Sequence, residues 1–141
     1  MFADAMYRFR AIFPERSCIM VVNDDPEIVE LYRLILEQQG YAVIGVYTSY
    51  DALTILNEIN PDLIITNVAR SPMDGWEFIT NCKTNPLTKD IPIIVSSAQT
   101  YTQEKQRKYG KYIEEYLQLV FTPNQFINLV RRVLEKHTFQ Q

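Results

Sequence analysis

The stretch Asp62-Leu63-Ile64-Ile65-Thr66-Asn67 lies near the middle of the chain and decides its fold. Residues 63–65 form a short apolar run behind Pro61, which is typical of a strand buried on both faces of a parallel sheet. The residue that leaves this strand is Asn67. Functional groups of open α/β sheets lie at the carboxyl ends of the strands, so Asn67 occupies a position where such a group is expected.

The composition is that of one ordinary globular domain. The chain has 141 residues, of which 47% are hydrophobic and 22% charged, and this length is sufficient for a single core without disulfides or metals. A net charge of −3 argues against a surface for nucleic acid or anionic membranes. No apolar run approaches the roughly 20 residues that span a bilayer. We therefore expect a cytoplasmic protein that binds neither nucleic acid nor membrane.

Cysteine and histidine residues are too few and too widely spaced in the sequence to indicate a metal site or histidine-based catalysis. The two cysteines, Cys18 and Cys82, lack any close metal-ligand spacing, and we predict buried or half-buried free thiols in a reducing compartment. The only histidine is His137, near the C-terminal end. This argues strongly against histidine-based catalysis and histidine-rich metal sites.

Residues 1–17 differ from the rest of the chain because charges interrupt their apolar side chains. A secretory signal needs a continuous apolar stretch, so we predict instead an amphipathic N-terminal extension whose helix ends before Pro14. Two alternatives stay open for it. It packs against its own domain or is partly disordered, or it is a docking arm for a partner.

Five strand–helix units follow over residues 18–137, leaving a tail at 138–141. The predicted strands are residues 18–22, 43–46, 63–65, 91–96 and 116–119. The predicted helices start near residues 26, 49, 75, 102 and 123. Several starts carry capping signals, such as Asp25 before Pro26 and the boxes that begin at Thr48 and Thr122. Right-handed crossovers turn this order into an α/β fold, a five-stranded doubly wound parallel sheet in a flavodoxin-like three-layer sandwich.

Five short segments, in this order and spacing, resemble the receiver domain of bacterial response regulators. They are residues 21–26 (Val-Val-Asn-Asp-Asp-Pro), 61–65 (Pro-Asp-Leu-Ile-Ile), 73–77 (Met-Asp-Gly-Trp-Glu), 91–94 (Ile-Pro-Ile-Ile) and 115–117 (Glu-Tyr-Leu). The resemblance runs from about Cys18 to His137. It implies a receiver-type fold and a role in two-component, or phosphorelay, signal transduction.

The resemblance also implies roles for single positions. In that family an aspartate that ends the third strand accepts a phosphoryl group, a pair of acids holds Mg²⁺, and a hydroxyl and a lysine contact the phosphoryl oxygens. In this sequence the corresponding positions are Asn67 for the acceptor, Asn23 and Asp24 for the acid pair, the Ala69 carbonyl for a further metal ligand, Ser97 for the hydroxyl, Tyr116 for the switch aromatic, and Leu119 for the lysine, with Val120 where a proline usually follows.

Three of these positions depart from the pattern in ways that fit together. The carboxamide of Asn67 is a far poorer nucleophile than a carboxylate. Asparagine at positions 23 and 67 leaves Asp24 as one carboxylate where three are expected, and Mg²⁺ prefers anionic oxygens. Leu119 offers no cation. We therefore predict no catalytic residue, no enzyme activity and no cofactor, with Mg²⁺ bound weakly or not at all.

Plainer interpretations of the same residues stay open. In these interpretations Asp24 and Asp25 only cap the first helix, and Asn67 only hydrogen-bonds Ser97 or a loop amide. The pair Asp74-Gly75 is a turn and cap signal shared by many folds.

Aromatic and basic residues gather around the fourth helix and the fifth strand. They include Tyr101, Lys105, Tyr109, Tyr112 and Tyr116. One interpretation is an ordinary solvated face. The resemblance implies the other, a docking face for a histidine kinase, a phosphotransfer protein, an output protein or a second copy in a homodimer, since aromatic residues mark interfaces.

Three classes of function compete for this sequence. The first is a phosphorylation-independent receiver-like domain, or pseudo-receiver, that acts through protein contacts. The second is a flavodoxin-like binder of a small molecule or nucleotide, although residues 23–26 are acidic where a phosphate loop should attract anions. The third, a metal-dependent phosphatase or transferase, lacks a nucleophile.

Overall fold

A computed structural model describes residues 16–68 and 74–139 of the chain, with side chains up to His137. Its strands are β1 (Cys18–Val22), β2 (Ala42–Val46), β3 (Leu63–Thr66), β4 (Ile93–Ser97) and β5 (Glu115–Gln118). Its helices are α2 (Pro26–Gln38), α3 (Ser49–Leu56), α4 (Gly75–Thr84), α5 (Gln103–Tyr109), the 3₁₀ turn η1 (Gly110–Tyr112) and α6 (Pro123–Phe139).

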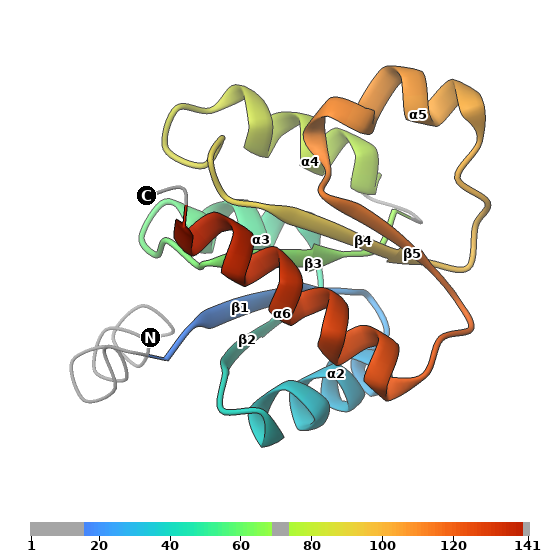
Figure 1. The fold of residues 1–141 in the computed structure, drawn as a ribbon. Coiled ribbons are helices and arrows are strands. Elements are labelled where there is room, and N and C mark those ends of the chain that lie inside the picture. Colours follow the sequence, from blue (N-terminus) through green and yellow to red (C-terminus); the bar gives the residue numbers. More distant parts are fainter. Residues whose placement is uncertain (1–15, 69–73, 140–141) are drawn as a thin grey trace.

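The five strands form one parallel sheet in the order β2-β1-β3-β4-β5 (Figure 1). This is the order of a doubly wound flavodoxin-like fold, and it confirms the predicted fold class. Because β3 lies at the centre, between β1 and β4, residues 63–66 are flanked by strands on both sides. Its four residues are all buried.

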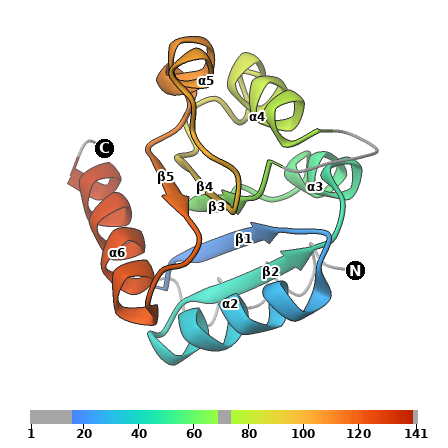
Figure 2. The ribbon, with the colours of Figure 1, turned by 90° about the vertical axis from the view of Figure 1, so that its right-hand side faces the viewer.

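Successive strand residues face two separate cores. One core holds Met20 and Ile64 and lies under α3, α4 and α5; the other holds Ile19 and Ile65 and lies under α2 and α6. Figure 2 shows the sheet between these two helical layers. The alternation of period two, with both faces apolar, explains why the strands are continuous hydrophobic runs in the sequence.

Side-chain caps start the helices where the sequence predicts them. The carboxylate of Asp25 accepts the amide of Glu27 at 2.9 Å, and the hydroxyl of Thr48 accepts the amide of Asp51 at 3.0 Å. At α6 the capping box is reciprocal, since Thr122 accepts from the amide of Gln125 while its own amide donates to the Gln125 side chain at 2.8 Å. Each cap satisfies amides that the helix itself leaves unpaired.

A few predicted boundaries were wrong by one or two residues. β4 begins at Ile93 rather than Ile91, because the Ile91 amide closes a turn onto the Thr88 carbonyl and Pro92 has no amide hydrogen. β5 covers Glu115–Gln118, so Leu119 follows the strand instead of ending it. α6 ends at Phe139. Of the predicted N-terminal extension, residues 1–17, the first 15 lie outside the described part of the chain.

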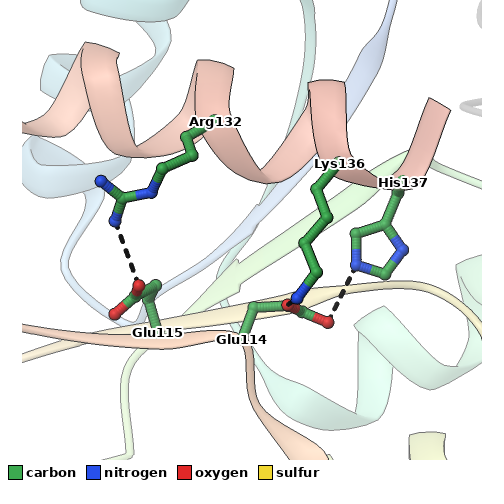
Figure 3. A network of polar contacts seen from close by, with 5 residues as sticks. All are labelled: Glu114, Glu115, Arg132, Lys136 and His137. Atoms are coloured by element: carbon green, nitrogen blue, oxygen red, sulfur yellow. Dashed lines mark hydrogen bonds and ion pairs between the residues drawn. The ribbon is translucent and has the colours of Figure 1, made fainter. Parts of the chain in front are cut away.

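Basic side chains of α6 hold the amino end of β5 (Figure 3). His137 Nε2 and Lys136 Nζ donate to the Glu114 carboxylate at 2.8 and 3.3 Å, and Arg132 donates to Glu115 at 3.1 Å. Burial raises the pKa of Glu114, but the hydrogen bonds from His137 and Lys136 outweigh it and hold that pKa below its usual value. These contacts fix the strand that carries Tyr116.

Both cysteines are buried thiols, as predicted. Burial raises the pKa of Cys82 to about 12, so its thiol stays protonated and unreactive near neutral pH. Within the described part of the chain, no helix is both long and apolar enough to cross a membrane.

Candidate functional site

The carboxyl ends of β1 and β3 bring three of the predicted site residues together. The two strands pair in parallel with Val22 opposite Thr66, so Asn23 and Asn67 leave the sheet side by side. Backbone hydrogen bonds hold both, since the amide of Asn23 donates to the carbonyl of Val46 at 3.0 Å and the amide of Asn67 to that of Val22 at 3.3 Å.

The side chain of Asn67 contacts Asp24. Its Nδ2 donates to the Asp24 carboxylate at 3.2 Å. This contact differs from the interpretation that Asn67 bonds Ser97 or a loop amide. Asn67 bonds Asp24 because a negatively charged carboxylate at the end of the neighbouring strand is a strong acceptor for its side-chain N–H. An aspartate at position 67 would instead face Asp24 as a second negative charge.

The residues present do not fit a Mg²⁺ site. Asp24 is the one carboxylate among the three positions, and one of its oxygens already accepts from Asn67. The carboxamide oxygen of Asn23 accepts the amide of Asp25 at 2.9 Å, and Asp25 itself caps α2. Mg²⁺ is bound by anionic oxygens in a demanding octahedral geometry. Among the described residues, no group of three or more acidic, histidine or cysteine side chains is placed to hold a metal. The Ala69 carbonyl lies outside them.

Gly75 fixes the chain that leaves β3. A Cβ atom added at Gly75 would lie 2.3 Å from the Asn67 carbonyl oxygen and 2.4 Å from the Cα of Val68. Asp74 caps the same helix end, accepting the amides of Trp76 and Glu77 at 2.7 and 3.1 Å. The first turn of α4 therefore presses directly on the backbone of Asn67, and only glycine leaves room for this approach.

The end of β4 supplies two hydroxyls that go to different places. Ser96 shares a 2.6 Å hydrogen bond with the buried phenol of Tyr32 on α2, and burial raises the pKa of that phenol. The Oγ of Ser97 instead accepts the amide of Gln99 at 3.0 Å. Ser97, the predicted hydroxyl position, is thus tied to the loop between β4 and α5.

The same loop residue holds the predicted switch aromatic. Tyr116 donates its hydroxyl hydrogen to the Gln99 carbonyl at 2.6 Å. Gln99 therefore bridges Ser97 and Tyr116, one through its amide and the other through its carbonyl. This bridge pins the β4–α5 loop between the sheet edge and β5.

Leu119 stands at the edge where the resemblance implies a lysine. Its amide donates to the Ser97 carbonyl at 2.9 Å, which places it beside the end of β4. Its side chain is 40% exposed, and the following residue, Val120, joined by a cis peptide bond, is 98% exposed. An isobutyl group at this position brings no charge and no hydrogen-bond donor to the edge.

Four rings from α4, α5, the loop before α5 and strand β5 form an aromatic plate (Trp76, Tyr101, Tyr109 and Tyr116). The Tyr101 and Tyr116 rings stack at 4.4 Å and 3°, and the Trp76 and Tyr109 rings at 4.5 Å and 16°. Trp76 also lies within 6.3 Å of Tyr101 and Tyr116, at 15° to each. Offset stacks of this kind are favourable beyond the area that they bury. The plate joins the switch aromatic to both helices.

Two residues of this arrangement escape a reading of the sequence. In the sequence Trp76 stands out only as part of the motif at residues 73–77, yet it is the ring that contacts the other three, and its exposed fraction is 5%. Gln99 carries no signal in the sequence at all, because its role depends on backbone atoms. A spacing of aromatic residues across three elements gives no local pattern to detect.

Comparison with known proteins agrees with this geometry. The family model of the response regulator receiver domain matches residues 19–131. The chain is 31% identical over 114 residues to an uncharacterized 14.6 kDa protein in the sodA1 3'region of Leptolyngbya boryana, covering 81% of this chain and 87% of that protein.

Two further relatives carry more informative descriptions. The phosphate regulon transcriptional regulatory protein PhoB of Escherichia coli is 27% identical over 118 residues, which cover 84% of this chain and 52% of PhoB, so the chain spans about half its length. The crystal structure of the N-terminal domain of a response regulator receiver protein from Methanoculleus marisnigri has a TM-score of 0.71 at 37% identity, covering 84% of this chain and 96% of that one.

The fold first places the chain among the flavodoxin-like α/β proteins, in which functional groups lie at the carboxyl ends of the strands. The chain belongs to the response regulator receiver domain family. It is thus a receiver domain of two-component signalling.

Proposed function

We propose that this receiver domain is a pseudo-receiver, which works in cytoplasmic two-component signalling without accepting a phosphoryl group. The observation that carries the proposal is the hydrogen bond from the Asn67 amide to Asp24 at 3.2 Å. A site prepared for phosphoryl transfer needs a free carboxylate at this position. Here the position carries a neutral group, and its amide nitrogen is engaged with the acid that remains.

The chemistry of transfer gives the reason. Phosphorylation of an aspartate forms a bond between a carboxylate oxygen and phosphorus, and the oxygen must be nucleophilic. The oxygen of a carboxamide has little of that character. The incoming phosphoryl oxygens also need positive charge around them. Leu119 carries no charge, and the side-chain oxygens of Asn23 and Asp24, which would bind a cation, are engaged in hydrogen bonds. The domain is therefore a module for contact rather than catalysis.

The bridge through Gln99 supports a conformation of the β4–α5 loop that forms without phosphorylation. The amide and carbonyl of Gln99 engage Ser97 and Tyr116, at 3.0 and 2.6 Å, without any added group. The two positions that the family resemblance links to switching are thus already connected. We infer one standing arrangement of the β4–α5 loop, with Tyr116 stacked against Tyr101.

Contact is proposed to occur through the basic–aromatic face, which we define as the aromatic plate together with Tyr112, Lys105, Lys108 and Lys111. Its rings are part-exposed except for the buried Trp76, and rigid aromatic side chains are favoured at interfaces. The partner would be a signalling protein, such as a histidine kinase, a phosphotransfer protein or an output protein, and a homodimer would use the same face.

Incubation with acetyl phosphate and Mg²⁺, followed by intact-protein mass measurement, tests the absence of phosphorylation. We expect no mass gain, because Asn67 offers no carboxylate. A stoichiometric gain of one phosphoryl group, stable in acid and labile in base, would contradict the proposal. The variant Asn67→Ser serves as the matched control, since it removes the carboxamide and should likewise show no mass gain.

A further inference from the structure

A groove lies between α3 and α4, which pack on the same face of the sheet (Figure 2). Its volume is about 410 Å³, within the range of roughly 300–1,000 Å³ that is typical of small-molecule sites. Asn23, Asp24 and Asn67 are not among the residues that line it. A ligand bound in this groove therefore does not depend on the chemistry at the carboxyl edge of the sheet.

The groove has a buried floor and a polar rim. Leu56 and Thr88 line it with exposed fractions of only 6% and 4%, and the hydroxyl of Thr88 already donates to the Cys82 carbonyl at 2.6 Å. Tyr50 in the first turn of α3 and Asn57 directly after that helix also line the groove, and both are exposed. A ligand thus meets mainly apolar surface below it and polar groups around it.

The carboxamides of the groove retain hydrogen-bonding groups for a ligand. The side chain of Asn57 has no hydrogen-bond partner in the described part of the chain. Asn85 follows α4 and lines the opposite side; its Oδ1 accepts the Leu87 amide at 2.9 Å, so its Nδ2 is left to donate. A carboxamide offers both donors and acceptors, which is why asparagine pairs well with the edge of adenine.

Charge narrows the class of ligand. None of the described residues that line the groove carries a charged side chain. A phosphate or carboxylate bound there would have no cation beside it, and the chain as a whole carries −3. The groove therefore suits a neutral molecule that has donors and acceptors of its own.

The ring of Tyr50 supplies the remaining contact. Its exposed fraction is 56%, and it stacks on no other ring among the described residues. Free aromatic faces bind nucleobases by stacking. Asn57 lies seven residues further along the same helix, about 10 Å away along its axis and on the same face. We propose that the groove binds a neutral purine nucleoside, with the base stacked on Tyr50 and the carboxamides of Asn57 and Asn85 bonded to its donors and acceptors.

Titration of the full chain with adenosine, followed by amide NMR, tests the proposal. We expect saturable shifts at Leu53, Asn57 and Asn85, which line the groove. Tyr50→Ala should weaken binding about tenfold, because it removes the stacking surface. Tyr47→Ala is the matched control and should bind like the unaltered chain, since Tyr47 is also exposed, at 46%, but does not line the groove.

Two further ligands test the class of molecule. Adenosine monophosphate should bind more weakly than adenosine, because no cation lines the groove, and ribose, which has no base to stack, should not bind. Absence of saturable shifts with adenosine would overturn the proposal, as would tighter binding of the monophosphate or equal binding of ribose. An equal loss of affinity in Tyr47→Ala and Tyr50→Ala would contradict the assignment of the base to Tyr50.

Discussion

The triple variant Asn23→Asp/Asn67→Asp/Leu119→Lys should accept a phosphoryl group from acetyl phosphate about a hundredfold faster than Asn67→Asp alone. The single change restores a nucleophilic carboxylate but places it beside Asp24, within reach of the oxygen that now accepts from Asn67. Two neighbouring carboxylates repel each other and the phosphodonor, and nothing at positions 23 or 119 offsets this charge.

The triple change supplies what the single one lacks. A third carboxylate at position 23 gives Mg²⁺ the anionic oxygens that it prefers. A lysine at position 119 brings a cation beside the end of β4, since the backbone there bonds Ser97. Groups that act together in catalysis contribute far from additively. The pair Asn23→Asp/Leu119→Lys, which retains Asn67, is the control and should stay unlabelled. Equal labelling rates for the single and triple variants would mean that only the nucleophile is missing.

The second large effect concerns stability. Gly75→Ala should lower the free energy of unfolding by about 3 kcal/mol, at the upper end of the usual cost of overpacking, because its Cβ would overlap backbone rather than a flexible side chain. For a domain of this size that corresponds to a fall in melting temperature of roughly 10 °C. Thermal and urea unfolding followed by circular dichroism measure it.

Gly110→Ala is the matched control for this effect. Gly110 has αR dihedrals, and a Cβ added there would come no closer than 3.6 Å to the Tyr101 hydroxyl. Alanine should therefore be neutral or slightly stabilising, because it restricts the unfolded chain. If Gly75→Ala melts like the unaltered protein, the first turn of α4 does not approach the backbone of Asn67 and Val68 as closely as described.

Local signals made most of the fold predictable. The apolar runs of β1 and β3, the caps at Asp25 and Thr48, and the stop at Gly40, whose φ is +92°, each depend on a few adjacent residues. The resulting strand–helix order leaves few topologies, because crossovers are right-handed. The boundaries that shifted, at β4 and β5, depend on turns and on pairing between strands that no local pattern encodes.

The candidate site was predictable in part for a different reason. Parallel strands must end at one edge, so the gathering of Asn23, Asp24 and Asn67 follows from topology. Their pairing does not, because the choice of Asp24 as the partner of Asn67 depends on side-chain distances. The bridge through Gln99 and the plate around Trp76 involve residues far apart in sequence, and they become visible only when the elements are packed.

The amide NMR spectrum of the full chain, recorded with and without acetyl phosphate and Mg²⁺, tests the central claim most directly. The claim is that Asn67 is not phosphorylated, so a phosphodonor causes no structural change at Asn67, Gln99 or Tyr116. We predict that the amide resonances of these three residues keep their positions. Concerted shifts of Asn67, Gln99 and Tyr116 on addition of the phosphodonor, and their reversal on its removal, would contradict the account.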